Sequence, residues 1–179
     1  LEAEIKSEQG LPLGRSGWES FLMEWIDHQT LVETVDWHHI WLGDASEYLL
    51  KLHAQGRLDT RFGEIKAKVF YHNPCHLKVQ NFRHSITLLK MIPGIEIVSV
   101  NTNCCGMGGS YGMKKQNRAR SVEIADKIWT EAKNANADLA ATECGGCGLQ
   151  IEAGTGMKVT HPIILVNQAY KAFKAREAA

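Results

Sequence analysis

The five cysteines are the residues best suited to chemistry in this 179-residue chain, and they fall into three groups. Cys104 and Cys105 are adjacent, within NTNCCGMGGSYG at residues 101–112. Adjacent cysteines rarely pair with each other, because their Cβ atoms diverge and the ring that closes is strained. We therefore expect these two sulfurs to face other partners. The remaining cysteines are Cys75, Cys144 and Cys147.

Each cysteine group follows a segment with the pattern of a β-strand. The strands that we expect are KVFYH at 68–72, IEIVSV at 95–100, DLAAT at 138–142 and MKVTH at 157–161. Helical spacing of apolar residues falls at 77–92, at 114–135, in a short segment after Cys147, and at 162–175. Strand alternating with helix indicates right-handed βαβ units. The sequence predicts an α/β fold with a four-stranded, mostly parallel sheet flanked by helices.

The carboxyl ends of parallel strands meet at one edge of the sheet, which is where open α/β sheets hold their ligands. Each cysteine group lies just past such an end, so we expect all five sulfurs to converge there. Five thiolates are one more than a single tetrahedral zinc ion uses. A cluster with several irons can use the fifth, so the pattern favours an iron–sulfur centre.

Two features of the loops suit a negatively charged centre. Gly106, with Gly108 and Gly109, lets the backbone pass close to it without interference from a Cβ atom. Cys144 and Cys147 span the first turn of an expected helix, where free amides and the dipole stabilise thiolates. His76 follows Cys75 directly and could donate a hydrogen bond to sulfur or take up a proton, or simply pack. His72 and His161 are further candidates near the site.

The composition is that of an ordinary globular protein. Twenty basic residues balance twenty acidic ones, so nothing in the charge favours nucleic acid or an anionic membrane. The longest apolar runs fall far short of the roughly 20 residues that cross a bilayer. Five cysteines do not suggest a secreted disulfide framework, and a reducing cytoplasm is expected. We divide the chain into a helical N-terminal segment with a linker, residues 1–64, and a cysteine-rich domain, residues 65–179. Capping boxes at Ser16 with Glu19 and at Asp44 with Glu47 predict two helices in the first part.

Several blocks together resemble one known family. YHNPCH at 71–76, CCGMGGSYG at 104–112 and ECGGC at 143–147 resemble the cysteine-rich CCG domain. This domain occurs in one of the subunits of heterodisulfide reductase and in iron–sulfur subunits of flavin-linked dehydrogenases. The blocks resemble in particular the C-terminal CCG domain of the anaerobic glycerol-3-phosphate dehydrogenase iron–sulfur subunit. That protein shares IPGIEI at 92–97, YGMKK at 111–115 and ADLAATEC at 137–144.

The resemblance implies that the five cysteines bind an iron–sulfur cluster, in one branch an unusual non-cubane [4Fe–4S] centre. It implies an electron-transfer subunit or domain of a quinone-reducing dehydrogenase complex, which carries electrons and does not bind the organic substrate. The expected partners are a flavoprotein subunit, other iron–sulfur or membrane-anchor subunits, and quinone. The expected location is the cytoplasm, with peripheral attachment to the inner face of the membrane. This chain has one CCG motif where longer members have two, and it lacks their ferredoxin-type cysteine run.

Other interpretations stay open at this point. The cluster could itself cleave a disulfide, as in a heterodisulfide reductase. Four of the cysteines could instead hold structural zinc in an interaction module, or all five could be buried free thiols. A thioredoxin-like use of Cys144 and Cys147 alone fits less well, because three further cysteines accompany them. The glycine run lacks the spacing of a phosphate-binding fingerprint.

Overall fold

The computed structural model describes residues 45–79 and 83–178, which belong to one compact unit. The predicted helix after Ser16 lies outside the described residues. The predicted helix after Asp44 is present as α4, Ala45–Ala54, and it packs against α6 and α9. Ser46 and Ser85 join α4 to α6 through a buried hydroxyl pair 2.7 Å apart. The boundary between the N-terminal segment and the cysteine-rich domain stays a prediction.

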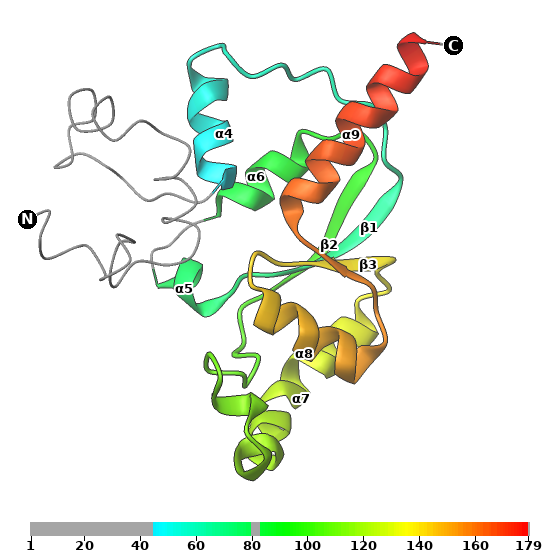
Figure 1. Cartoon of the computed structure of the whole chain (residues 1–179). Helices are drawn as coiled ribbons and strands as arrows, with labels where there is room; N and C mark the ends of the chain where they lie inside the picture. The colour runs from blue at the N-terminus through cyan, green and yellow to red at the C-terminus, as the bar shows by residue number, and fades with distance from the viewer. Residues whose placement is uncertain (1–44, 80–82, 179) are drawn as a thin grey trace, which may run out of the picture. The chain divides into compact units, whose positions relative to one another are not determined.

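The four strands form one all-parallel sheet in the order β2-β1-β3-β4, as predicted (Figure 1). The strands are β1, Ala67–His72; β2, Ile95–Asn101; β3, Leu139–Ala141; and β4, Val159–Thr160. Tyr71 on β1 is in register with Val100 on β2 and with Ala141 on β3. The chain therefore moves outward from β1 to β2, and then crosses to the other side of β1 to add β3 and β4.

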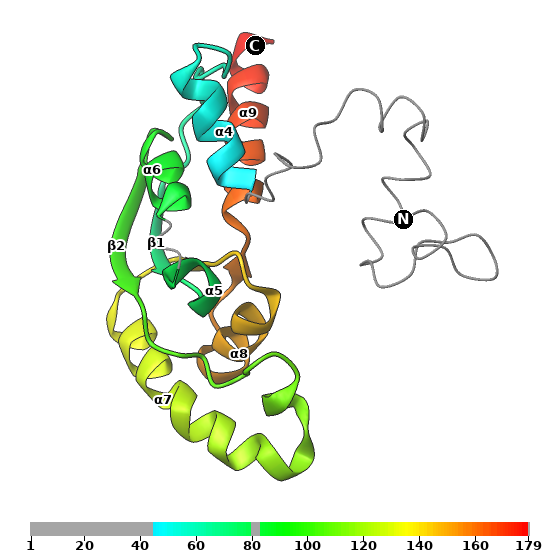
Figure 2. The same cartoon turned by 90° about the vertical axis from the view of Figure 1, so that its left-hand side faces the viewer.

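Helices connect and cover the strands. They are α5, Cys75–Lys78; α6, His84–Lys90; α7, Arg118–Asn134; α8, Gly145–Thr155; and α9, Pro162–Glu177. Two 3-10 turns, η2 at Tyr111–Met113 and η3 at Lys115–Asn117, precede α7. Figure 2 shows α4, α6 and α9 on one side of the sheet, and α7 and α8 on the other. None of the helices in the described ranges combines the length and apolar character that crossing a bilayer requires.

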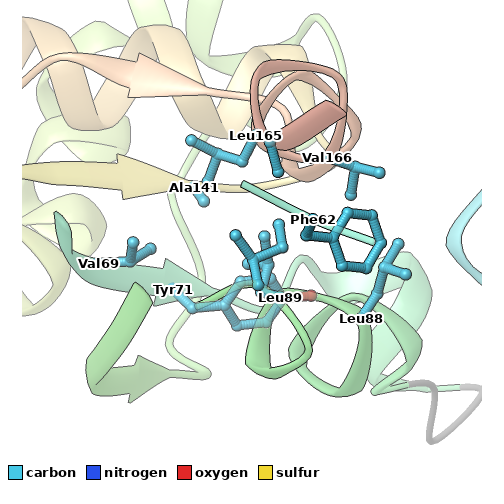
Figure 3. Packing of buried hydrophobic residues seen from close by; sticks show 10 residues of the cluster. Phe62, Val69, Tyr71, Leu88, Leu89, Ala141, Leu165 and Val166 are labelled. Atoms are coloured by element: carbon cyan, nitrogen blue, oxygen red, sulfur yellow. The ribbon is translucent and has the colours of Figure 1, made fainter. Parts of the chain in front are cut away.

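The sheet separates two hydrophobic cores because successive strand residues point to opposite faces. Val69 and Tyr71 of β1 pack with Leu88 and Leu89 of α6 and with residues of α9, as Figure 3 shows. The other face of β1 contributes Phe70. Phe70 belongs to the second core, whose buried members are Phe70, Cys105, Met107, Ile128, Ala132, Ala140, Cys147 and Ile151. The second core therefore contains two of the five cysteines.

One predicted helix differs in the structure. We expected a single helix over 77–92, and the structure has α5 and α6 instead. α5 already starts at Cys75, directly after Pro74, whose fixed φ suits a helix start. Lys78 at the end of α5 donates from Nζ to the Thr102 carbonyl oxygen, 3.0 Å away. α5 is thus tied to the cysteine loop, while α6 packs on the sheet.

Candidate functional site

The cysteine groups follow the carboxyl ends of three neighbouring strands. Cys75 begins α5 after β1, Cys104 and Cys105 follow β2, and Cys144 is the N-cap of α8 after β3. The order of the strands reverses at β1, because β2 lies on one side of it and β3 on the other. Such a switch point is where open α/β sheets bind their ligands. The topology therefore places these groups around one edge, as predicted.

Two cysteines that lie 42 positions apart in the sequence are in contact at this edge. The Sγ atoms of Cys147 and Cys105 are 3.0 Å apart, and both residues are buried. Cys147 donates a hydrogen bond to Cys105, and that bond is the main reason why the pKa of Cys105 is lowered to about 6. The same bond, followed by burial, raises the pKa of Cys147. Cys105 therefore ionises first, and Cys147 keeps its proton.

The other three cysteines extend this pair in two directions. Burial raises the pKa of Cys75, and the charges of Cys104 and Cys105 and a hydrogen bond with Cys104 raise it further. Cys144 interacts with Cys147 in the same way and adds to the rise of its pKa. The interactions run in order through Cys104, Cys75, Cys105, Cys147 and Cys144. Cys75 and Cys104 are exposed and Cys144 is half-buried, so the cysteine group reaches from the core to the surface.

Backbone amides of the glycine loop point at the sulfurs. The N–H of Gly106 donates to Cys104 Sγ over 3.4 Å, and the amides of Met107 and of Cys105 itself lower the pKa of Cys105. Amides aimed at thiolates stabilise negative charge without adding a counter-ion. Gly106 also has φ +79°, and a Cβ atom there would overlap the carbonyl oxygen of Ser121 on α7. This position therefore requires glycine both for its conformation and for the close approach of α7.

The donor set and its surroundings suit an iron–sulfur cluster. Thiolates are the usual protein ligands of such clusters, and hydrogen bonds to sulfur tune them. Among the residues that the structure describes, no three His, Cys, Asp or Glu side chains form a ready site for a metal ion. The ligand roles of Cys75, Cys104, Cys105, Cys144 and Cys147 thus remain a prediction, as does a cofactor contact of Gly106.

The structure ranks the candidate histidines differently from the sequence analysis. His76, the first candidate, is exposed beside Cys75. His161 caps α9, where its Nδ1 accepts a hydrogen bond from the amide of Ile163, 3.1 Å away. His72, a weaker candidate from the sequence, is fully buried at the end of β1. The alternation of side chains along β1 could have identified His72 from the sequence, because it places His72 on the same face of the sheet as Phe70.

A groove opens beside Cys144, on the side of the edge strand β4. It is lined by residues of the loop after β3, of α8, of β4 and of the start of α9, among them Thr142, Gly148, Leu149, Thr160, His161 and Ile164. Leu149 and Ile164 are large apolar side chains that remain 60% and 45% exposed. The surface next to the half-buried end of the cysteine group is therefore mainly apolar.

Comparison with known proteins agrees with the geometry. The chain is 39% identical over 103 residues to one of the subunits of anaerobic glycerol-3-phosphate dehydrogenase of Escherichia coli, an alignment that covers 57% of this chain and 26% of that protein. It is 30% identical over 97 residues to an iron–sulfur protein of Methanocaldococcus jannaschii, covering 51% and 19%. The identity is also 30% over 97 residues to one of the subunits of the dihydromethanophenazine:CoB–CoM heterodisulfide reductase of Methanosarcina barkeri, covering 50% and 23%.

This chain spans about a quarter of the length of the first two of these relatives or less, and the alignments cover about half of this chain. The sequence profile of the CCG cysteine-rich domain matches residues 69–152, from the middle of β1 to the middle of α8. That range contains all five cysteines. Residues 69–152 of this chain are therefore similar to the CCG cysteine-rich domain family.

Proposed function

We propose that this chain carries an iron–sulfur cluster and serves as an electron-transfer subunit or domain of a flavin-linked, quinone-reducing dehydrogenase complex. The observation that carries the proposal is the meeting of three distant loops, which includes the 3.0 Å Cys105–Cys147 contact. The proposed ligands are Cys75, Cys104, Cys105, Cys144 and Cys147. The relatives named as subunits of a dehydrogenase and of a reductase support partner subunits.

The residues of this chain divide the task between them. Cys105 and Cys147 hold the buried side of the site, and Cys75 and Cys104 hold the exposed side, where electrons can pass to a partner. The amides of Gly106 and Met107 stabilise the negative charge of the thiolates. When bound, the cluster supplies reversible one-electron chemistry at a potential set by such hydrogen bonds and by solvent exposure. We propose a partly exposed cluster of the [4Fe–4S] type, with the protein peripheral on the inner face of the cell membrane.

Metal analysis tests the ligand set. Protein purified without oxygen should contain iron and acid-labile sulfide, with visible absorption that dithionite bleaches. Cys105→Ser and Cys147→Ser should lose most of this iron, because each removes a buried thiolate. Val79→Ser is the matched control, since Val79 is 82% exposed and lies close to Cys75 in the sequence. Full iron in both cysteine variants, or zinc in place of iron, would contradict the proposal.

A second function is favoured by the same buried pair. Cys105 and Cys147 are close enough to exchange with a disulfide, and one relative belongs to a heterodisulfide reductase. The two functions differ in what the reduced protein does alone. An electron-transfer subunit returns its electrons to a quinone analogue or a flavoprotein and leaves disulfides intact. Turnover of a disulfide by the isolated chain would favour the reductase.

A further inference from the structure

His72 lies on the cysteine side of the sheet. Strand residues alternate between faces, so His72 points to the same face of β1 as Phe70. Phe70 packs in the core that contains Cys105 and Cys147. His72 comes two residues after Phe70 and is therefore closer to the sheet edge where the cysteines gather. Its side chain is fully buried. Among the described histidines it is the only fully buried one.

The hydrogen bonds of Asn101 fix which nitrogen of His72 carries the proton. The Asn101 amide group donates from Nδ2 to Glu131 Oε2, 2.5 Å away. Its Oδ1 accepts from the backbone N–H of Asn103 at 3.1 Å and lies 3.0 Å from His72 Nδ1. An amide oxygen only accepts, so His72 Nδ1 must be the donor. The neutral ring therefore has its lone pair on Nε2.

No group in the described part of the protein donates a hydrogen bond to that lone pair. His72 Nε2 is buried and makes no hydrogen bond within the described part of the chain, although buried polar atoms are normally paired. Burial lowers the pKa of His72, so the ring is neutral near pH 7. The carboxylate of Glu131, reached through Asn101, acts in the opposite sense and favours the imidazolium. The ring is thus a neutral base with an anionic partner already in place.

Glu131 of α7 is the charged group that acts on this ring. Cys75 and Lys78 of α5 follow His72 in the chain, and Cys105 of the glycine loop and Cys147 of α8 belong to the core of Phe70, on the same face of β1. Glu143 belongs to the opposite face, where it accepts from the hydroxyl of Tyr71 over 2.8 Å. Of these groups on the His72 side, Glu131 is anionic, and Cys105 is the thiol that ionises first. Extra negative charge at the cysteines would therefore favour protonation of His72.

We propose, building on the iron–sulfur function above, that His72 takes up one proton when one electron enters the cysteine centre. The electron comes from the reductant, a flavoprotein or dithionite, and the proton comes from solvent water. One N–H bond forms at Nε2, the Nδ1–H bond to Asn101 stays in place, and reoxidation releases the proton. His72 acts as a positioning and charge-compensating residue and is not a ligand.

Redox titration of the whole iron-loaded chain tests the coupling. In the wild type, the midpoint potential should fall as pH rises, because proton uptake accompanies the electron. His72→Gln should lose that slope, and exposed His53→Gln, on α4, should keep it. Glu131→Gln keeps the side-chain size and should move the pH-dependent range to lower pH. A slope unchanged in His72→Gln, a slope lost in His76→Gln instead, or no slope in the wild type would overturn the proposal.

The tautomer is tested separately in metal-free protein. Nitrogen-15 spectra of labelled histidine should show His72 neutral, with the proton on Nδ1 and a bare Nε2, at neutral pH. A proton on Nε2 would overturn the proposal whether or not iron binds. Absence of iron from anaerobic wild-type protein would instead defeat the proposed function. Equal iron content and equal thermal unfolding in His72→Gln and wild type show that any change in slope does not come from misfolding.

Discussion

His72 is the last residue of β1, His76 follows four residues later on α5, and only His72 is removed from water. In the unfolded chain its pKa is near the ordinary 6.5, and burial lowers that value in the folded protein. Below pH 6.5 the unfolded state therefore binds the proton more tightly than the folded state. The free energy of unfolding is fully preserved above this pH and declines as pH falls toward the lowered pKa.

We predict that His72→Gln weakens this acid dependence. One proton accounts for a slope of at most about 1.4 kcal/mol per pH unit. Denaturant unfolding of metal-free protein at several pH values between neutral and mildly acidic measures it. The variant should show a shallower decline than the wild type over that range. Parallel curves for the two proteins would mean that other groups cause the acid sensitivity.

The sequence identified the cysteines more readily than this histidine. Cysteine is distinctive by type, and the positions after strand ends require only local patterns and the parallel sheet. The importance of His72 depends on which face of β1 carries the cysteines. That face is set by where α7 and α8 pack, which is a long-range property. His76 looked better from sequence alone because it adjoins Cys75.

At the scale of elements, the first three strands were predictable because each is a short, mainly apolar run followed by polar or turn residues. The break between α5 and α6 was not. The apolar spacing over 77–92 fits one continuous helix. In the structure, however, Lys78 donates a hydrogen bond to the Thr102 carbonyl oxygen, and Leu88 and Leu89 pack on the sheet. Both contacts involve residues from distant parts of the chain. Local periodicity carries no information about them.

The glycine loop provides a test in which conformation and contact can be separated. Gly106 and Gly109 both have positive φ, +79° and +64°, but a Cβ atom would meet Ser121 only at Gly106 and open space at Gly109. Strain from positive φ costs about 1 kcal/mol in either case. We predict that Gly106→Ala lowers the free energy of unfolding further, by about 1–3 kcal/mol more, and lowers iron content. Gly109→Ala should keep its iron.

Unfolding curves and iron analysis of the two alanine variants give the comparison. The difference between them isolates the contact of the loop with α7, because the conformational cost is shared. Equal stability and equal iron in both would show that α7 moves aside easily. In that case the close approach at Gly106 does not help to shape the cysteine site.

For the whole molecule, the two cores have different relations to the site. The core of α4, α6 and α9 contains no cysteine, whereas the core of α7 and α8 contains Cys105 and Cys147. The packing on one face of the sheet therefore does not involve the cysteines. On the other face, packing and the cysteine centre share the same residues. Loss of the centre should affect the two faces unequally.

We predict that removing iron with a chelator leaves the sheet folded but loosens one face. Amide hydrogen exchange should stay slow in β1 and α6, and should quicken in the loop from Cys104 to Met113 and in the first turn of α8. Leu165→Ala is the opposite perturbation, since Leu165 is 2% exposed in the cysteine-free core. It should lower the free energy of unfolding by about 2–5 kcal/mol and leave the iron content of the folded protein unchanged. If iron removal exposes β1 and the cysteine loop to the same degree, the two faces unfold as one unit, and the cysteine centre supports the whole fold.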